Sequence, residues 1–166
     1  MKRKILCVLL SLMLCTAVSA CAESNSKADS TSSAESSASA VNNITADKLI
    51  DTAAEESMTQ KAYYADDVFR SNVKKLYGIE YDTIEDGAIA YGDNGSADEL
   101  SILKLKDGTS AQKALEGRLQ NRKTQFENYK PSEMPKLEAA LIFEVNGYWV
   151  LIVSDNAESI KEKIGN

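Results

Sequence analysis

The stretch that decides the fold is AALIFEVNGYWVLIVS (residues 139–154), two apolar runs separated by Asn146 and Gly147. Asn-Gly between such runs favours a two-residue type I′ turn, because both central residues of that turn need positive φ. The turn pairs Val145 with Tyr148, and alternate residues of each strand then share a face. One face carries Leu141, Phe143, Val145, Tyr148, Val150 and Ile152, and the other carries Ile142, Glu144, Trp149, Leu151 and Val153. Both faces are largely apolar, so we expect a central hairpin covered on both sides.

The rest of the chain supplies the elements that pack around this hairpin. Apolar spacing and capping residues predict helices over 45–58, from Asp66 to Tyr77, from Thr109 or Ser110 to Tyr129, and after Asp155. Gly78 follows the second helix, where a left-handed C-cap would end it. Two more strands are expected over 86–91 and 99–106. The sequence therefore predicts one small α+β domain over 44–166, in the order α-α-β-β-α-β-β-α, with a four-stranded, mainly antiparallel sheet packed against the long helix.

Residues 1–20 have the three-part plan of a secretory signal, with a basic start, an apolar middle and small residues at the end. The apolar middle is shorter than the roughly 20 residues that a membrane-spanning helix needs. Val18-Ser19-Ala20-Cys21 resembles the lipobox of bacterial lipoproteins, in which a diacylglyceryl group is attached to the cysteine sulfur and the leader is cut before it. Two other interpretations stay open, namely ordinary secretory cleavage near Ala20-Cys21-Ala22 and an uncut leader. We expect Cys21 to be the lipidation site and the covalent lipid to be the sole cofactor.

The segment 21–43 is rich in Ser and Ala and contains no aromatic residue. Such a composition is typical of a disordered tether between an anchor and a folded domain. With a lipidated cysteine before it, this tether predicts a domain held at the outer face of the bacterial cytoplasmic membrane.

Composition excludes several functional classes. The net charge is −6, and the leader contains three of the cations, so the part after it is more acidic still; this disfavours nucleic-acid binding. All three cysteines lie at or before Cys21, which leaves the domain without a disulfide. The chain has no histidine, hence no imidazole base and no His-ligated metal site. We therefore expect no enzyme and no metal; a carboxylate-dependent envelope enzyme, which needs two acidic groups facing each other across a cleft, is the weaker alternative.

Two arginines of the long helix are candidates for an ion pair or an anion contact. Arg118 and Arg122 lie four residues apart and flank the apolar stripe, and either could pair with Glu99 or Glu127 or receive an anionic ligand. The alternative is that both arms lie along the helix with solvated guanidinium groups.

Trp149 is the candidate for recognition of a partner. If the first two helices leave its face open, Trp149, Ile142, Leu151 and Val153 form an exposed apolar patch, which usually marks an interface. If helices cover this face, Trp149 belongs to the core, and we favour that second arrangement.

Six short motifs of the domain belong together, namely Tyr77-Gly78-Ile79, Ala97-Asp98-Glu99-Leu100, Arg118-Leu119, Phe126, Tyr129-Lys130-Pro131 and Gly147-Tyr148. In these motifs the chain resembles a family of bacterial lipoproteins, mostly Gram-positive, with a C-terminal domain of unknown function numbered 4358. The resemblance spans Ile44 to about Asp155 in addition to the leader. It implies a fold and a surface location, and it carries no established activity or functional residues.

From these observations we expect a membrane-anchored extracytoplasmic lipoprotein that acts as a binding or interaction module. It would contact the membrane through its lipid, and a protein partner, a small ligand or a second copy of itself through the domain. The alternative is a structural or self-associating accessory lipoprotein of the cell envelope.

Overall fold

The computed structural model describes residues 44–93 and 95–166. The expected leader over 1–20, Cys21 and the expected tether over 21–43 lie outside the described residues. Within the described ranges, no helix combines the length and the hydropathy needed to cross a bilayer.

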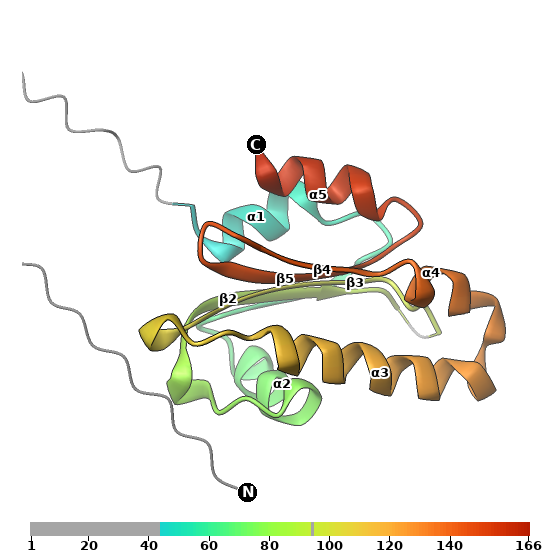
Figure 1. Cartoon of the computed structure of the whole chain (residues 1–166), viewed down its shortest axis with the longest axis horizontal. Coiled ribbons are helices and arrows are strands. Elements are labelled where there is room, and N and C mark those ends of the chain that lie inside the picture. Colours follow the sequence, from blue (N-terminus) through green and yellow to red (C-terminus); the bar gives the residue numbers. More distant parts are fainter. Residues whose placement is uncertain (1–43, 94) are drawn as a thin grey trace, which may run out of the picture. The chain divides into compact units, whose positions relative to one another are not determined.

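The described chain forms a five-stranded antiparallel sheet with helices on both faces (Figure 1). The strand order is β1-β2-β3-β5-β4, and each neighbouring pair is antiparallel. The strands are β1 (Gln60–Tyr63), β2 (Ile84–Tyr91), β3 (Glu99–Leu105), β4 (Leu141–Val145) and β5 (Tyr148–Val153). The α-helices are α1 (Ala46–Ala53), α2 (Asp67–Tyr77), α3 (Gln112–Tyr129), α4 (Met134–Glu138) and α5 (Ala157–Gly165).

The hairpin of β4 and β5 has the predicted turn and register. Asn146 and Gly147 have φ of 51° and 80°, the positive values that a type I′ turn requires. Val145 pairs with Tyr148, so the two faces of the hairpin carry the expected sets of side chains.

Helices cover both faces of the sheet, and each layer has its own core. Helices α1 and α5 pack on the face that carries Ile102, Val150 and Ile152. Helices α2, α3 and α4 pack on the face that carries Leu103, Leu151 and Val153. Figure 1 shows the two layers on opposite sides of the sheet. Any side chain in the middle of β3 or β5 is therefore enclosed, whichever way it points.

The prediction of four strands was wrong, because β1 adds a fifth. Of its four residues, only Ala62 is buried, so the segment lacks the apolar alternation that predicts a strand. The predicted element order therefore lacks β1, which lies between α1 and α2. The predicted order also lacks the short α4 after Pro131.

One helix boundary and the position of the hairpin also differ from the predictions. Helix α1 ends at Ala53 instead of Met58, and the Met58 side chain fills the core from the connection that follows. The hairpin is not central, since β5 lies inside the sheet while β4 forms its outer edge. Residue pattern alone does not distinguish these positions, because helices cover the faces of an edge strand as well.

Candidate functional site

A buried ion pair links β3 to α3. Glu99 is the first residue of β3 and has no exposed surface. The guanidinium group of Arg118 donates to both of its carboxylate oxygens, with 2.7 Å from Nη2 to Oε2 and 3.0 Å from Nε to Oε1. Arg122, one helical turn further along α3, places its Nε 3.6 Å from Oε2. The structure thus brings together three residues that the sequence singled out as candidates for an ion pair.

Two hydroxyl groups complete this arrangement. The Tyr77 hydroxyl, at the end of α2, donates to Oε1 of Glu99 over 2.7 Å. It also lies 2.7 Å from Oγ of Ser101, which itself donates to Glu99 over 3.1 Å. We call Tyr77, Glu99, Ser101, Arg118 and Arg122 the Glu99 cluster. Sequence reasoning missed Tyr77 and Ser101; for Ser101 a signal existed, because it lies two residues from Glu99 and therefore on the same face of β3.

The electrostatics of the Glu99 cluster follow from burial and contact. Burial opposes ionisation of Glu99, but the attraction of Arg118 and its hydrogen bonds outweighs burial and holds the Glu99 pKa below its usual value. Burial, together with the negative charge of Glu99, raises the pKa of the Tyr77 hydroxyl well above its usual value. The Tyr77 hydroxyl therefore stays protonated and can donate to the carboxylate.

The two arginines differ in how well they are compensated. Burial disfavours the charge of both; for Arg118 the contact with Glu99 outweighs burial and raises its pKa, whereas for Arg122 burial prevails and lowers its pKa. Arg122 donates to the backbone oxygen of Ser96 over 3.1 Å, and its buried Nε makes no hydrogen bond with any described residue. The Arg118 and Arg122 side chains are only 11% and 12% exposed. The Glu99 cluster is thus enclosed between sheet and helix, and its geometry suits a structural clamp better than a ligand site.

The candidate patch around Trp149 is not an exposed surface. Leu151 and Val153 have no exposed area, while Ile142 and Trp149 are partly buried against the core of the α2–α3 side. Most of this surface is core, as the sequence favoured, but the helix that lies over the hairpin is α3, whereas α1 lies on the opposite face. Only the rim formed by Ile142 and Trp149 reaches solvent.

The outer edge of β4 is a surface with unused hydrogen-bonding groups. Since Val145 and Tyr148 flank the two-residue turn, they form a hydrogen-bonded pair, and hydrogen-bonded pairs alternate along an antiparallel ladder. The N–H and C=O groups of Ile142 and Glu144 therefore point away from β5. In the described part of the chain, β4 pairs with β5 alone, so this row of backbone groups has no strand partner.

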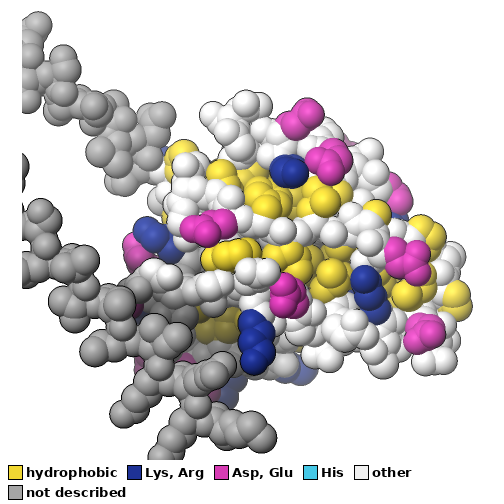
Figure 2. All heavy atoms as spheres, viewed as in Figure 1, with side chains coloured by type: hydrophobic (Ala, Val, Ile, Leu, Met, Phe, Trp, Pro, Cys, Tyr) yellow, Lys and Arg dark blue, Asp and Glu magenta, His cyan; other side chains and the backbone are white. Residues whose placement is uncertain are grey.

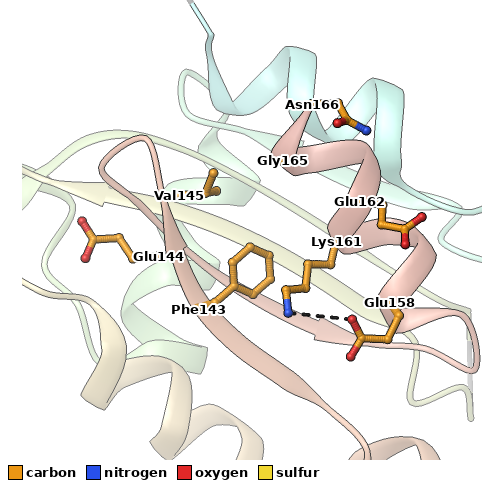
Figure 3. A pocket seen from close by; sticks show the side chains of 8 residues that line it. All are labelled: Phe143, Glu144, Val145, Glu158, Lys161, Glu162, Gly165 and Asn166. Atoms are coloured by element: carbon orange, nitrogen blue, oxygen red, sulfur yellow. Dashed lines mark ion pairs between the residues drawn. The ribbon is translucent and has the colours of Figure 1, made fainter.

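A groove of about 610 Å³ lies between β4 and α5. Phe143 and Val145 of β4 form its apolar part, and Glu158, Lys161 and Glu162 of α5 line the opposite wall. Figure 3 shows the Phe143 ring beside the Lys161 side chain, whose Nζ lies 5.5 Å from the ring centroid. On the face of Figure 2, hydrophobic side chains gather between α5 and α3. An extended segment paired with β4 could cover these side chains.

The opposite edge of the sheet is less suited to pairing. Strand β1 has four residues, and its Lys61 side chain pairs with Asp51 of α1 over 2.9 Å. A short edge strand with a lysine is a usual protection against further pairing. Strand β4 has neither Pro nor Lys, and Glu144 is its one charged residue. The site that the structure offers is therefore β4.

A comparison with known families tests the resemblance drawn from the sequence. Residues 57–154 match the family described as Domain of unknown function (DUF4358). This span exceeds half of the chain. The chain belongs to the DUF4358 family. Neither a curated protein nor a solved structure matches it.

The DUF4358 match covers most elements of the domain but not its first and last helices. It contains all five strands, α2, α3 and α4, and thus the whole Glu99 cluster. Helices α1 and α5 lie outside the matched residues, so the α5 wall of the groove does too. The family match therefore locates the sheet and β4 but says nothing about a ligand.

Several acidic side chains of this DUF4358 domain are engaged in ion pairs. Lys136 of α4, for example, pairs with Asp98 over 2.9 Å and with Glu133 over 3.3 Å. No set of three or more Cys, Asp or Glu side chains within 44–93 and 95–166 is placed to hold a metal ion.

Proposed function

We propose that this chain is a membrane-anchored extracytoplasmic lipoprotein that binds a protein partner along the outer edge of β4. The leader and Cys21 support the anchor, as does the Ser- and Ala-rich segment that follows. The single observation that carries the binding role is the unpaired edge of β4, with the apolar groove beside it.

The physical reason for binding at β4 is that backbone donors and acceptors of this strand point away from the sheet. The N–H and C=O groups of Ile142 and Glu144 point away from β5, and an extended peptide can pair with them as a sixth strand. Backbone bonds alone give little specificity, because every peptide has them. Side chains of the added strand would lie beside Phe143 and Val145, and covering this apolar surface would supply affinity.

A second candidate function is self-association as an accessory lipoprotein of the envelope. Strand β4 can pair with β4 of a second copy about a two-fold axis at Phe143. In that register Ile142 of one copy lies opposite Glu144 of the other, and both direct their backbone groups outward. The free edge thus permits a dimer as well as a foreign strand.

The anchor is tested by the Cys21→Ser substitution. We expect the variant to leave the membrane fraction for the medium, or to accumulate as an uncut precursor, because serine cannot form the thioether. Cell fractionation and intact mass measure this result. A wild-type protein whose Cys21 is unmodified, or a variant with unchanged mass and fractionation, would overturn the anchor.

The binding edge is tested by Glu144→Pro with Glu144→Thr as its matched control. Both substitutions remove the charge, but only proline removes the outward N–H and blocks pairing, and proline is tolerated where an edge strand faces solvent. We expect proteins that cross-link to the wild type and the Thr variant in whole cells to be lost from the Pro variant. Circular dichroism checks that the variants are folded, and identical cross-linked partners for all three proteins would contradict binding at β4.

A further inference from the structure

The groove beside β4 carries an excess of negative charge. Its α5 wall carries Glu158, Lys161 and Glu162, while Glu144 of β4 lies at its margin with the side chain directed to the other side of the strand; all four are exposed. Lys161 lies 3.8 Å from Glu158, so the one ammonium group of the groove is already engaged by one of the three carboxylates. Glu144 and Glu162 remain available to a cation from outside.

The position of Glu144 defines where such a cation would lie. Residues directly opposite each other in an antiparallel pair place their side chains on the same face, with Cβ atoms about 5 Å apart. The residue opposite Glu144 in an added strand would point to the α3 side, as Glu144 does. In Figure 3 the Glu144 side chain points away from the groove, on the other side of the strand from Phe143. A lysine or arginine at that position can pair with the Glu144 carboxylate.

The neighbours of that residue would point the other way, into the groove. They lie opposite Phe143 and Val145, which are partly exposed and pack against the core of the α1–α5 side. Apolar side chains at these two positions would cover Phe143 and Val145, whereas polar ones would lose water without gaining a partner.

We infer that the β4 edge takes an extended peptide segment in which a lysine or arginine, opposite Glu144, stands between two apolar residues. This inference rests on the proposed binding function and names the chemistry of its partner. The partner is a basic, apolar-alternating segment of another protein.

Charge disfavours a second copy of this chain in the same place. In the symmetric register about Phe143, each Glu144 faces Ile142 and receives no cation. The two α5 helices would then bring Glu158 and Glu162 of both copies to one side of the joined sheet. Opposite charge attracts and like charge repels across paired strands, so a cationic segment fits better than a copy.

Three end-blocked heptapeptides test the inference: one alternates valine with lysine, one valine with glutamate, and one valine with serine. Each is titrated into the full chain in non-ionic detergent. Trp149 serves as the reporter, because it is the single tryptophan and lies opposite Glu144 in the β4–β5 pair. We expect the lysine peptide to bind about threefold more tightly than the serine peptide and the glutamate peptide to bind most weakly.

The Glu144→Lys variant reverses the test without altering a buried residue. We expect it to prefer the glutamate peptide over the lysine peptide, while Glu144→Pro binds none of them. Equal affinity of all three peptides, with binding lost in Glu144→Pro, would overturn the charge preference and leave the binding edge in place. Binding unaffected by Glu144→Pro would overturn both proposals. A third outcome is that none of the peptides binds, that the full chain forms dimers, and that Glu144→Pro abolishes these dimers. This result would show that the partner of β4 is a second copy and not a cationic segment.

Discussion

Both faces of the sheet have an apolar core, but at the start of β3 the two faces differ. Leu100 and Ile102 point to the α1–α5 side, where apolar side chains fill the space. Glu99 and Ser101, in alternation with them, point to the α2–α3 side, where they bond to Tyr77 and Arg118. Apolar packing is non-directional, whereas hydrogen bonds and ion pairs fix distance and angle. We therefore expect the α1–α5 face to tolerate substitution and the α2–α3 face to be sensitive to it.

The family match adds to this contrast. The matched residues include the α2–α3 face, with the hydrogen bonds and ion pairs of the Glu99 cluster, and leave out α1 and α5. The Glu99 cluster joins the end of α2, the start of β3 and the middle of α3. We infer that the cluster holds these three elements in register, while the α1–α5 layer closes the opposite side.

The largest expected effect is that of Glu99→Ala. Removal of the carboxylate leaves Arg118 and Arg122 buried without their counter-charge, and breaking a buried pair in this way costs about 3–5 kcal/mol in the free energy of unfolding. Urea denaturation followed by Trp149 fluorescence measures the loss. The control is Ile102→Val, on the same strand but the opposite face, with an expected loss of about 1 kcal/mol. A smaller loss for Glu99→Ala than for this control would refute the contrast between the faces.

The next largest expected effect is a difference in stability loss between Tyr77→Phe and Tyr148→Phe. Tyr77→Phe removes the hydroxyl that donates to Glu99, and a hydrogen bond to a charged group contributes about 1.5–3 kcal/mol. Tyr148→Phe removes hydroxyl contacts to Asp86, at 2.6 Å, and to the Ile44 carbonyl oxygen, at 3.1 Å. Asp86 is partly exposed, so water can replace the lost bond, and we expect a loss of about 1 kcal/mol. Thermal denaturation of both variants measures the difference; equal losses would show that burial of the partner does not matter here.

The smallest expected effect is that of pH, because the lowered pKa keeps Glu99 charged over most of the accessible range. The usual glutamate pKa of about 4.3 applies to the unfolded chain. The stability that Glu99 contributes is therefore complete above that pH and is lost as the pH falls towards the lower pKa of the folded state. Unfolding free energies at about pH 6 and about pH 3.5 should fall more for the wild type and Ile102→Val than for Glu99→Ala. Parallel losses in all three proteins would assign the acid sensitivity to other carboxylates.

The sequence predicted the turns and helix ends that a few neighbouring residues determine. Asn146-Gly147 determines the turn and hence the register of β4 and β5, and Gly78, with φ of 67°, ends α2 as expected. The order of the strands was not predictable, because it depends on contacts between distant segments. Strand β1 was missed for the same reason, since it is a strand only by virtue of pairing with β2.

The candidate sites show the same limit. The sequence offered Glu99 and Glu127 as possible partners of the two arginines, and only the packing of α3 on β3 selects Glu99. Tyr77 was not predictable, because its hydroxyl reaches Glu99 only through the packing of α2 against β3. The groove at β4 was missed because apolar residues on both faces suggested a central strand. Only the topology of residues 44–93 and 95–166 shows that β4 is an edge strand there.

The hydrogen bond between Tyr148 and Ile44 has a mechanical consequence. In the proposed arrangement a lipid holds the chain ahead of Ile44 and a partner holds β4, so tension between membrane and partner is transmitted through the domain. The Tyr148 hydroxyl joins the entry point of the chain to β5, the strand that is hydrogen-bonded to β4. A pulling force on the chain ahead of Ile44 would then reach β5 through this hydrogen bond as well as α1 through the backbone.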